Sequence, residues 1–332
     1  MRPAVIFAAL AVLLSPFLFV IYRLSVFNTV PHDNYAAFLL WTAGNSEGAL
    51  PESPYCYRIL SMLAALPLYF VTPAIRLTNI PADLTSAYLR ATFALSMLAF
   101  FATIAAAMLM ARLGSREFGF NRSESVLAGA LLFALVWYTQ ITSIDPLAIL
   151  LIAAAICLLR RPVWFALMVL VSVPVNEKVA LVLACWLSVR CLMHPDARAR
   201  LWRQWASALA GVVLYAAIVK FVRLPGNEYQ VDPINYPATA IENAAAWFTG
   251  RGIMLNALPA IVLGALGIAG HWARAPDRVR DWFRPTDLLV IPILLAVALI
   301  VTHLFQAGRI VLHAAPLFVI PAVLALRRPV AP

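Results

Sequence analysis

The sequence is poor in charge and in cysteine. Only 12% of its 332 residues are Asp, Glu, Lys or Arg, whereas about a quarter of the residues in a typical soluble protein are charged. So few charges cannot cover the surface of a soluble enzyme, a secreted disulfide scaffold or a disordered regulator. The four cysteines show no CxxC or Cys/His spacing, which argues against a zinc site or a disulfide framework.

Apolar residues are abundant in their place. They make up 63% of the chain, and the mean hydropathy is +0.87. A helix needs about 20 apolar residues to cross the hydrocarbon of a bilayer. The sequence predicts an all-α polytopic membrane protein, a single transmembrane domain over residues 1–332. The expected spans are 4–22, 88–111, 124–142, 145–160, 163–176, 178–193, 206–222, 253–270, 287–303 and 309–326. The first stretch is expected to be a signal anchor rather than a removed peptide.

The net charge of +10 comes almost wholly from arginine, since lysine occurs only at Lys178 and Lys220. Counting spans places the five arginine-rich segments on one face, which predicts that this face is cytoplasmic. The charge therefore indicates membrane orientation rather than a nucleic-acid partner. These segments are 112–122, 160–161, 198–203, 274–284 and 327–328.

The stretch 56–75 leaves two topologies open. If it crosses the membrane, there are eleven spans and residues 23–55 are cytoplasmic. If it lies in the interface or re-enters, there are about ten spans, both termini are cytoplasmic, and 23–87 and 223–252 are external loops. The arginine at position 58 and the prolines at 67 and 73 favour the second topology. The composition, rich in alanine and arginine and poor in lysine, indicates a bacterial inner (plasma) membrane.

That topology gathers the unusual polar residues on the external face. Ionisable groups within or beside membrane spans are costly and tend to mark function. The sequence therefore predicts one external site at membrane level. The residues concerned are His32, Asp33, Glu47, Glu52, Asp145, Asn176, Glu177, Lys178, Glu228, Asp232, Glu242, Arg251, His303, Gln306, Arg309 and His313.

The two carboxylates Asp33 and Asp145 each have two interpretations. Both precede apolar runs and suit helix N-caps, Asp145 with Pro146 at the first helical position. Asp33 also suits a general base that takes a proton from an acceptor hydroxyl.

Arg58 and the pair Glu177 and Lys178 also have two interpretations each. Arg58 follows Tyr55 and Tyr57 and suits an interfacial anchor, or a clamp on a phosphate. Glu177 and Lys178 suit a tight turn closed by their own ion pair, or contacts to a sugar hydroxyl and a phosphate.

Near the carboxyl end, Arg309 and His313 are spaced i, i+4. This spacing suits a structural cluster on one helix face. The alternative is that Arg309 is a second anion contact.

In their order along the chain, Asp33 with Tyr35, the segment Pro54 to Leu60 with Arg58, and then Asp145 resemble the GT-C superfamily of membrane glycosyltransferases. The resemblance is to protein mannosyltransferases and to the aminoarabinose transferases of lipid A. Those proteins have a catalytic acidic residue soon after the first span, then a proline-flanked juxtamembrane helix with a basic residue, then a second external acidic residue. The resemblance covers about the first 180 residues.

The resemblance implies a mannosyltransferase-like hexosyltransferase that moves a sugar from a polyprenyl-phosphate donor to a glycan or lipid acceptor. It implies that Asp33 is the base and that Asp145 orients a substrate. Substrate contacts would come from His32, Tyr35, Arg58, Glu177, Lys178 and Arg309. The paired-acid motif of the family is replaced by His32-Asp33-Asn34, so the sequence does not support a divalent metal.

Two other classes remain as alternatives. A transporter or lipid flippase would have polar groups through the depth of the bundle, helices broken near the midplane and inverted repeats, whereas these spans are apolar at their centres. A scaffold subunit without chemistry would use every polar residue as a cap or an interfacial anchor.

Overall fold

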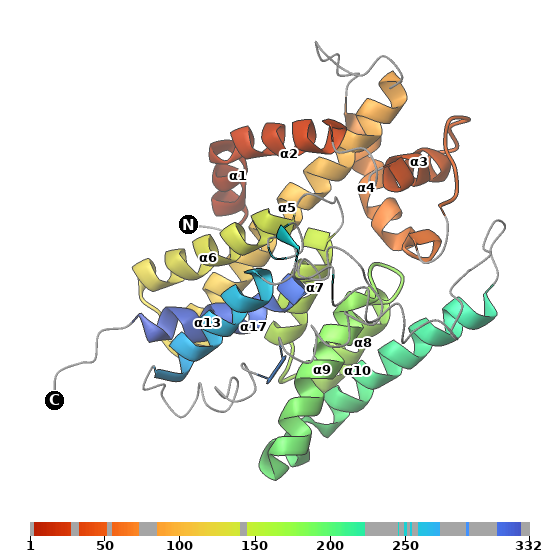
Figure 1. Cartoon of the computed structure of the whole chain (residues 1–332). Helices are drawn as coiled ribbons and strands as arrows, with labels where there is room; N and C mark the ends of the chain where they lie inside the picture. The colour runs from red at the N-terminus through yellow and green to blue at the C-terminus, as the bar shows by residue number, and fades with distance from the viewer. Residues whose placement is uncertain are drawn as a thin grey trace.

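The computed structural model describes residues 3–27, 33–51, 55–72, 85–139, 145–222, 245, 249–250, 253, 258–272, 290–291 and 311–326. Within these ranges every regular element is a helix and there is no strand, which confirms the predicted all-α class. The elements are α1 (Pro3–Leu13), α2 (Ser15–Phe27), α3 (Asp33–Thr42), η1 (Tyr55–Tyr57), α4 (Ile59–Val71), α5 (Ser86–Phe118), α6 (Arg122–Thr139), α7 (Asp145–Cys157), α8 (Pro162–Ser172), α9 (Lys178–Met193), α10 (Pro195–Phe221), α13 (Leu258–Trp272), η4 (Leu312–Ala314) and α17 (Ala315–Ala325). The long helix α5 contacts α1 to α4, α6, α7 and α17, whereas α8, α9 and α10 pack together to one side, as Figure 1 shows.

Local signals in the sequence set the ends of α5 and the start of α6. The Thr85 side chain accepts a hydrogen bond from the backbone N–H of Tyr88 and caps α5. Gly119 ends the helix in the left-handed conformation, φ +65°, which glycine adopts without a steric penalty. Asn121 and Glu124 then form a reciprocal capping box, each side chain accepting from the other's backbone N–H at 2.9 Å.

The predicted single span 4–22 is wrong in one respect, because the chain forms two helices there. A turn at Leu14 separates α1 from α2, and Figure 1 shows them at a marked angle. Pro16 has no backbone N–H, and its ring conflicts with a carbonyl four residues earlier. A proline is tolerated in the first turn of α2, so the helix restarts at Ser15.

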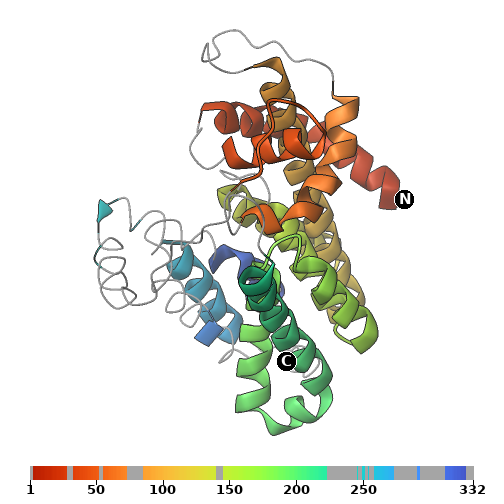
Figure 2. The same ribbon diagram turned by 90° about the vertical axis from the view of Figure 1, so that its right-hand side faces the viewer.

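The helices from α5 to α10 run back and forth between two ends of the bundle. At one end, which we call the polar end, lie Arg58, Asp145 and Lys178. At the other, the arginine end, Arg160 pairs with Glu117 at 3.0 Å, and α9 turns into α10 through His194. In Figure 2 the α9–α10 turn lies at the bottom, whereas α3 and α4 lie in the upper part.

Three of the five predicted arginine-rich segments fall within the described chain, and they lie at the arginine end. The segments 112–122, 160–161 and 198–203 follow or precede helix ends that are remote from Asp145. The segments 274–284 and 327–328 lie outside the described residues.

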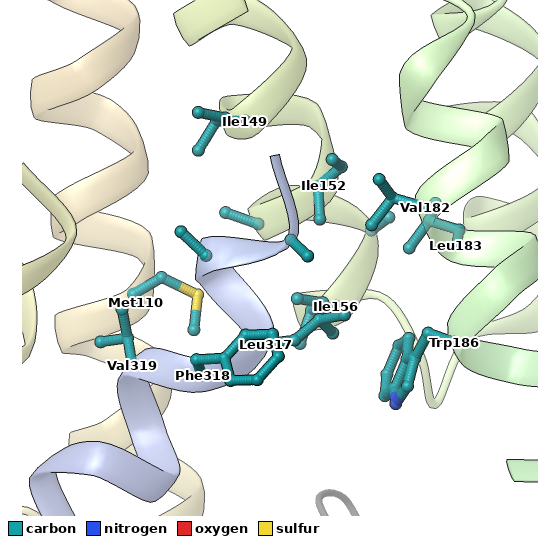
Figure 3. Packing of buried hydrophobic residues seen from close by; sticks show 14 of the residues in the cluster. Met110, Ile149, Ile152, Ile156, Val182, Leu183, Trp186, Leu317, Phe318 and Val319 are labelled. Carbon is teal, nitrogen blue, oxygen red and sulfur yellow. The ribbon is translucent and has the colours of Figure 1, made fainter. Parts of the chain in front are cut away.

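The apolar core fills the space between α5, α6, α7, α9 and α17. Ile149, Ile152 and Ile156 of α7 belong to one buried cluster with Val182 and Trp186 of α9 and Phe318 of α17. Figure 3 shows Ile152 beside Val182 of α9. Continuous burial of α7 explains why this helix is apolar on all sides. A second cluster packs α3 and α4 against the first half of α5.

Two of the described helices, α5 and α10, are long and apolar enough to cross a membrane by length and composition. The neighbours α7, α8 and α9 have 13, 11 and 16 residues. The prediction of about ten spans therefore stays a prediction. The expected span 287–303 lies almost entirely outside the described residues.

Candidate functional site

Arg58 lies at the junction of η1 and α4, where its side chain meets two distant parts of the chain. Its Nε donates to Glu177 Oε2 at 3.0 Å, and a terminal guanidinium nitrogen donates to Glu177 Oε1. The other terminal nitrogen donates to the hydroxyl of Tyr35 in α3. Two parallel hydrogen bonds from guanidinium to carboxylate are the strong form of this pair.

Backbone carbonyls hold this segment in place. The Tyr57 hydroxyl donates to the carbonyl of Val222, just after α10, at 2.7 Å. The Leu60 N–H donates to the carbonyl of Pro174 at 3.2 Å, and the Ser61 hydroxyl donates to the carbonyl of Val175 at 2.8 Å. The start of α4 is therefore fixed against the α8–α9 connection, which positions Arg58 opposite Glu177.

A second ion pair surrounds Asp145 at the start of α7. Its Oδ1 lies 3.1 Å from Lys178 Nζ and 3.3 Å from His313 Nε2. Asn176 Nδ2 lies 3.5 Å from the same oxygen, while Asn176 Oδ1 accepts from the backbone N–H of Lys178 at 3.1 Å. The Asp145 carboxylate thus collects groups from α7, the α8–α9 connection, α9 and η4.

The two ion pairs are neighbours because Asn176, Glu177 and Lys178 are consecutive. Together they place two cations and two carboxylates at the polar end, and we call these residues with Tyr35, Asn176 and His313 the ionic cluster. The exposed fraction of the side chain is 4% for Arg58, 2% for Asp145 and 7% for Lys178, but 17% for Glu177. Glu177 is therefore the most accessible charge of the four.

Electrostatics keep the Arg58–Glu177 pair ionised. Burial by itself would raise the pKa of Glu177, but the charges of Arg58 and Lys178 outweigh burial, and its pKa is lowered. Burial likewise opposes the charge on Arg58, yet Glu177 and Tyr35 raise the pKa of this guanidinium well above its ordinary value.

Of the residues predicted for the site, five converge in the ionic cluster: Tyr35, Arg58, Asp145, Glu177 and Lys178. The predicted catalytic residue Asp33 begins α3, two residues before Tyr35. Its side chain, and the predicted contacts His32 and Arg309, lie outside the described residues.

One interpretation from the sequence is wrong. Glu177 and Lys178 do not close a turn with each other, because the structure directs Glu177 to Arg58 and Lys178 to Asp145. Neighbouring side chains in a chain that enters a helix point in different directions, so each finds its own partner.

Two members of the ionic cluster were not predicted as site residues. Asn176 was grouped with the external polar set without a role of its own, and His313 was expected only in a structural cluster with Arg309. Their signal is that each lies in or beside an apolar run, where an unsatisfied polar group is costly. Both are fully buried in the structure.

The structure gives no independent support to a metal centre. Within the residues that it describes, no three His, Cys, Asp or Glu side chains lie together as metal ligands would.

Comparisons with models of protein families, with curated proteins and with solved structures found no match.

Proposed function

We propose that this chain is a polytopic membrane glycosyltransferase that moves a sugar from a polyprenyl-phosphate donor to a glycan or lipid acceptor. The reaction takes place on the external face, at the polar end of the bundle. The observation that carries the proposal is the ionic cluster, which joins two buried cations and two carboxylates from distant parts of an apolar chain.

The apolar outer surface supports the membrane location. Val213 and Phe221 of α10 are 67% and 75% exposed, and Val12 and Leu13 of α1 are 76% and 74% exposed. Exposed apolar surface of this extent is unfavourable in water and marks contact with protein or lipid. A bilayer covers such helices without a protein partner.

The cost of the ionic cluster supports a functional role. Buried ion pairs add little to stability compared with well-packed apolar residues, because both charges lose their hydration. In membrane proteins such charges mark substrate sites and ion paths. Tyr35, Arg58 and Glu177 come from three separate segments, so the arrangement is built by the tertiary fold rather than by one local turn.

The ionic cluster suits a phosphate leaving group. Arg58 already holds an oxyanion, the Glu177 carboxylate, in the bidentate geometry that a phosphate also fits. In our proposal the donor phosphate replaces Glu177 on Arg58, and Lys178 adds a second positive charge beside it. These cations stabilise the negative charge that develops on the leaving phosphate.

The transfer itself follows from the resemblance to the GT-C superfamily. The acceptor hydroxyl attacks the anomeric carbon while the bond from that carbon to the phosphate oxygen breaks. The electron pair leaves with the polyprenyl phosphate, and the hydroxyl proton passes to the Asp33 carboxylate. Asp145, held by Lys178 and His313, keeps Lys178 in position.

The test is sugar transfer by the purified chain in proteoliposomes that contain a radiolabelled polyprenyl-phosphate hexose. General-base catalysis contributes about 10²–10⁴-fold, so we expect Asp33→Asn to lose at least about 100-fold in rate. Asp196→Asn is the matched control, because Asp196 lies exposed in the first turn of α10 at the arginine end. Equal rates for Asp33→Asn and the wild-type chain would reject the proposal.

A transporter or flippase is the second candidate, and Asp145 with Lys178 and His313 favours it. Buried carboxylate and imidazole groups in contact are the parts of proton relays in pumps and transporters. Wild-type proteoliposomes that move labelled lipid or acidify in response to a substrate gradient, without sugar transfer, would favour this class.

A further inference from the structure

A cavity lined in part by arginines lies at the arginine end, away from the ionic cluster. It has a volume of about 470 Å³ and is bounded by the connection between α7 and α8, the start of α8 and the first turns of α10. Its lining includes Leu159, Arg160, Arg200, Trp202, Arg203 and Gln204. Three guanidinium groups thus surround one cavity.

Besides the arginines, the lining of this cavity contains one buried polar side chain, that of Gln204. Its side chain is buried, and Nε2 donates to the carbonyl of Leu159 at 2.7 Å. This bond fixes the orientation of the amide, so the acceptor oxygen Oε1 is fixed as well. Among the described residues no group donates a hydrogen bond to that buried oxygen, and such an orphan acceptor is costly unless a ligand or water supplies a donor.

Each of the three arginines that line the cavity makes a contact of its own. Arg200 Nε donates to the carbonyl of Asp196 at 3.3 Å, one turn earlier in α10. Arg203 lies over the Trp202 ring at 5.5 Å. Arg160 is 64% exposed and pairs with Glu117. The lining of the cavity therefore combines three exposed arginines with the buried Gln204.

We infer that this cavity binds a phosphate ester that carries a hydroxyl group. The phosphate contacts Arg200 and Arg203, and the hydroxyl donates to Oε1 of Gln204. Two sources share this chemistry: the headgroup of a glycerol phospholipid in the leaflet at the arginine end, or a soluble glycerol phosphate. The lipid source rests on the proposed membrane location, whereas neither source requires sugar transfer.

Binding is measured on the full-length chain in detergent by native mass spectrometry. The lipid probes are phosphatidylglycerol, phosphatidylmethanol, which has the same charge without the headgroup hydroxyls, and zwitterionic phosphatidylcholine. The soluble probe is glycerol 3-phosphate in excess. The variants are Arg200→Gln with Arg203→Gln, Gln204→Leu, and Arg198→Gln as matched control, since Arg198 is exposed on α10 but does not line the cavity.

We expect phosphatidylglycerol to bind more tightly than both other lipids. The double arginine variant should bind it about tenfold more weakly, the effect of losing charge-assisted hydrogen bonds, whereas Arg198→Gln should bind it as the wild-type chain does. Gln204→Leu should lose the preference for phosphatidylglycerol over phosphatidylmethanol. The double variant should fold as the wild-type chain does, because both replaced side chains are exposed. Its loss of binding is therefore the decisive result.

Competition separates the two sources. Glycerol 3-phosphate that displaces phosphatidylglycerol and raises the melting temperature identifies a soluble ligand, and retention of the lipid identifies the headgroup. Equal binding by the double variant and Arg198→Gln, or absence of binding for both kinds of probe, would overturn the inference. A chain that binds phosphatidylglycerol but transfers no sugar would reject the proposed function and keep this site.

Discussion

Arg58 and Glu177 illustrate how residues 119 positions apart depend on each other. Each charge has lost most of its contact with water, so each relies on the other for solvation. Removing one partner of a buried pair leaves an uncompensated charge, which costs more than the pair ever contributed. The consequences can be tested one residue at a time.

Glu177→Gln should lower the free energy of unfolding by about 3 kcal/mol at pH 7, because Arg58 then stays buried against a neutral amide. The pKa of Glu177 is lowered in the folded chain. Its contribution is therefore complete above the ordinary glutamate pKa and is lost as the pH falls towards the folded value. We expect the difference between the wild-type chain and the variant to shrink below about pH 4.5, as measured by thermal unfolding in detergent.

Glu117→Gln is the matched control. Glu117 pairs with Arg160, whose side chain is 64% exposed, and exposed pairs contribute about 0–1 kcal/mol. Equal losses for the two glutamine variants at pH 7 would contradict the importance of burial at Arg58.

The Asp145–Lys178 pair allows a double-mutant cycle. Asp145→Asn and Lys178→Met should each destabilise the fold by about 3 kcal/mol, because each removes an oppositely charged partner from a buried charge. The double variant should lose less than the sum, since neither charge then remains. Additive losses in chemical or thermal unfolding would mean that the two side chains do not depend on each other.

The unusual charged residues were predictable from the sequence, but the residues that they contact were not. Arg58, Asp145 and Lys178 stand out because charges are rare in apolar segments. Their partners are chosen by packing between segments more than 30 residues apart, and a single sequence carries no record of that packing. The short-range pairing of Glu177 with Lys178 was wrong for this reason.

At the scale of an element, Gly211 sets how closely α10 approaches its neighbours. A Cβ at this position would lie 2.6 Å from Val169 Cγ1 of α8 and 3.1 Å from Ala180 Cβ of α9. The valine side chain is branched at Cβ and has little freedom to move away. The glycine therefore permits a three-helix contact that any larger residue would widen.

Gly211→Ala should destabilise the fold by about 1–3 kcal/mol through overpacking. Gly264→Ala is the control, because a Cβ there meets nothing within 4 Å inside helix α13, and alanine favours a helix by about 1 kcal/mol over glycine. Gly264→Ala should thus be neutral or stabilising. Equal melting temperatures for the two variants would contradict the close approach of α10.

Helix boundaries were predictable where a local signal marks them. The predicted stretch 178–193 coincides with α9, and the predicted start at Asp145 coincides with that of α7. Helix α5 extends seven residues beyond its predicted end at 111, as far as the glycine at 119. The apolar pattern stops at Arg112, but the backbone continues to the first residue that favours a left-handed turn.

At the scale of the whole molecule, the two ends of the helix bundle carry different charged groups. The ionic cluster lies at the polar end, and the described arginine-rich turns lie at the other. Helix α5, with 33 residues, spans about 50 Å between the two ends. Opposite ends of a bundle of this length suit opposite sides of a bilayer.

The most direct test of the central claim is side-specific thiol labelling in intact cells. Single cysteines replace Ser46 and Ser123 in a chain whose four native cysteines are changed to alanine. Both serines are exposed. Ser46 precedes Glu47, which contacts Thr85 at the start of α5, whereas Ser123 lies at the start of α6 at the arginine end. A membrane-impermeant reagent should label Ser46→Cys from outside and Ser123→Cys only after permeabilisation. Labelling of both positions from the same side, with or without permeabilisation, would contradict a bundle that spans the membrane with the ionic cluster at its external face.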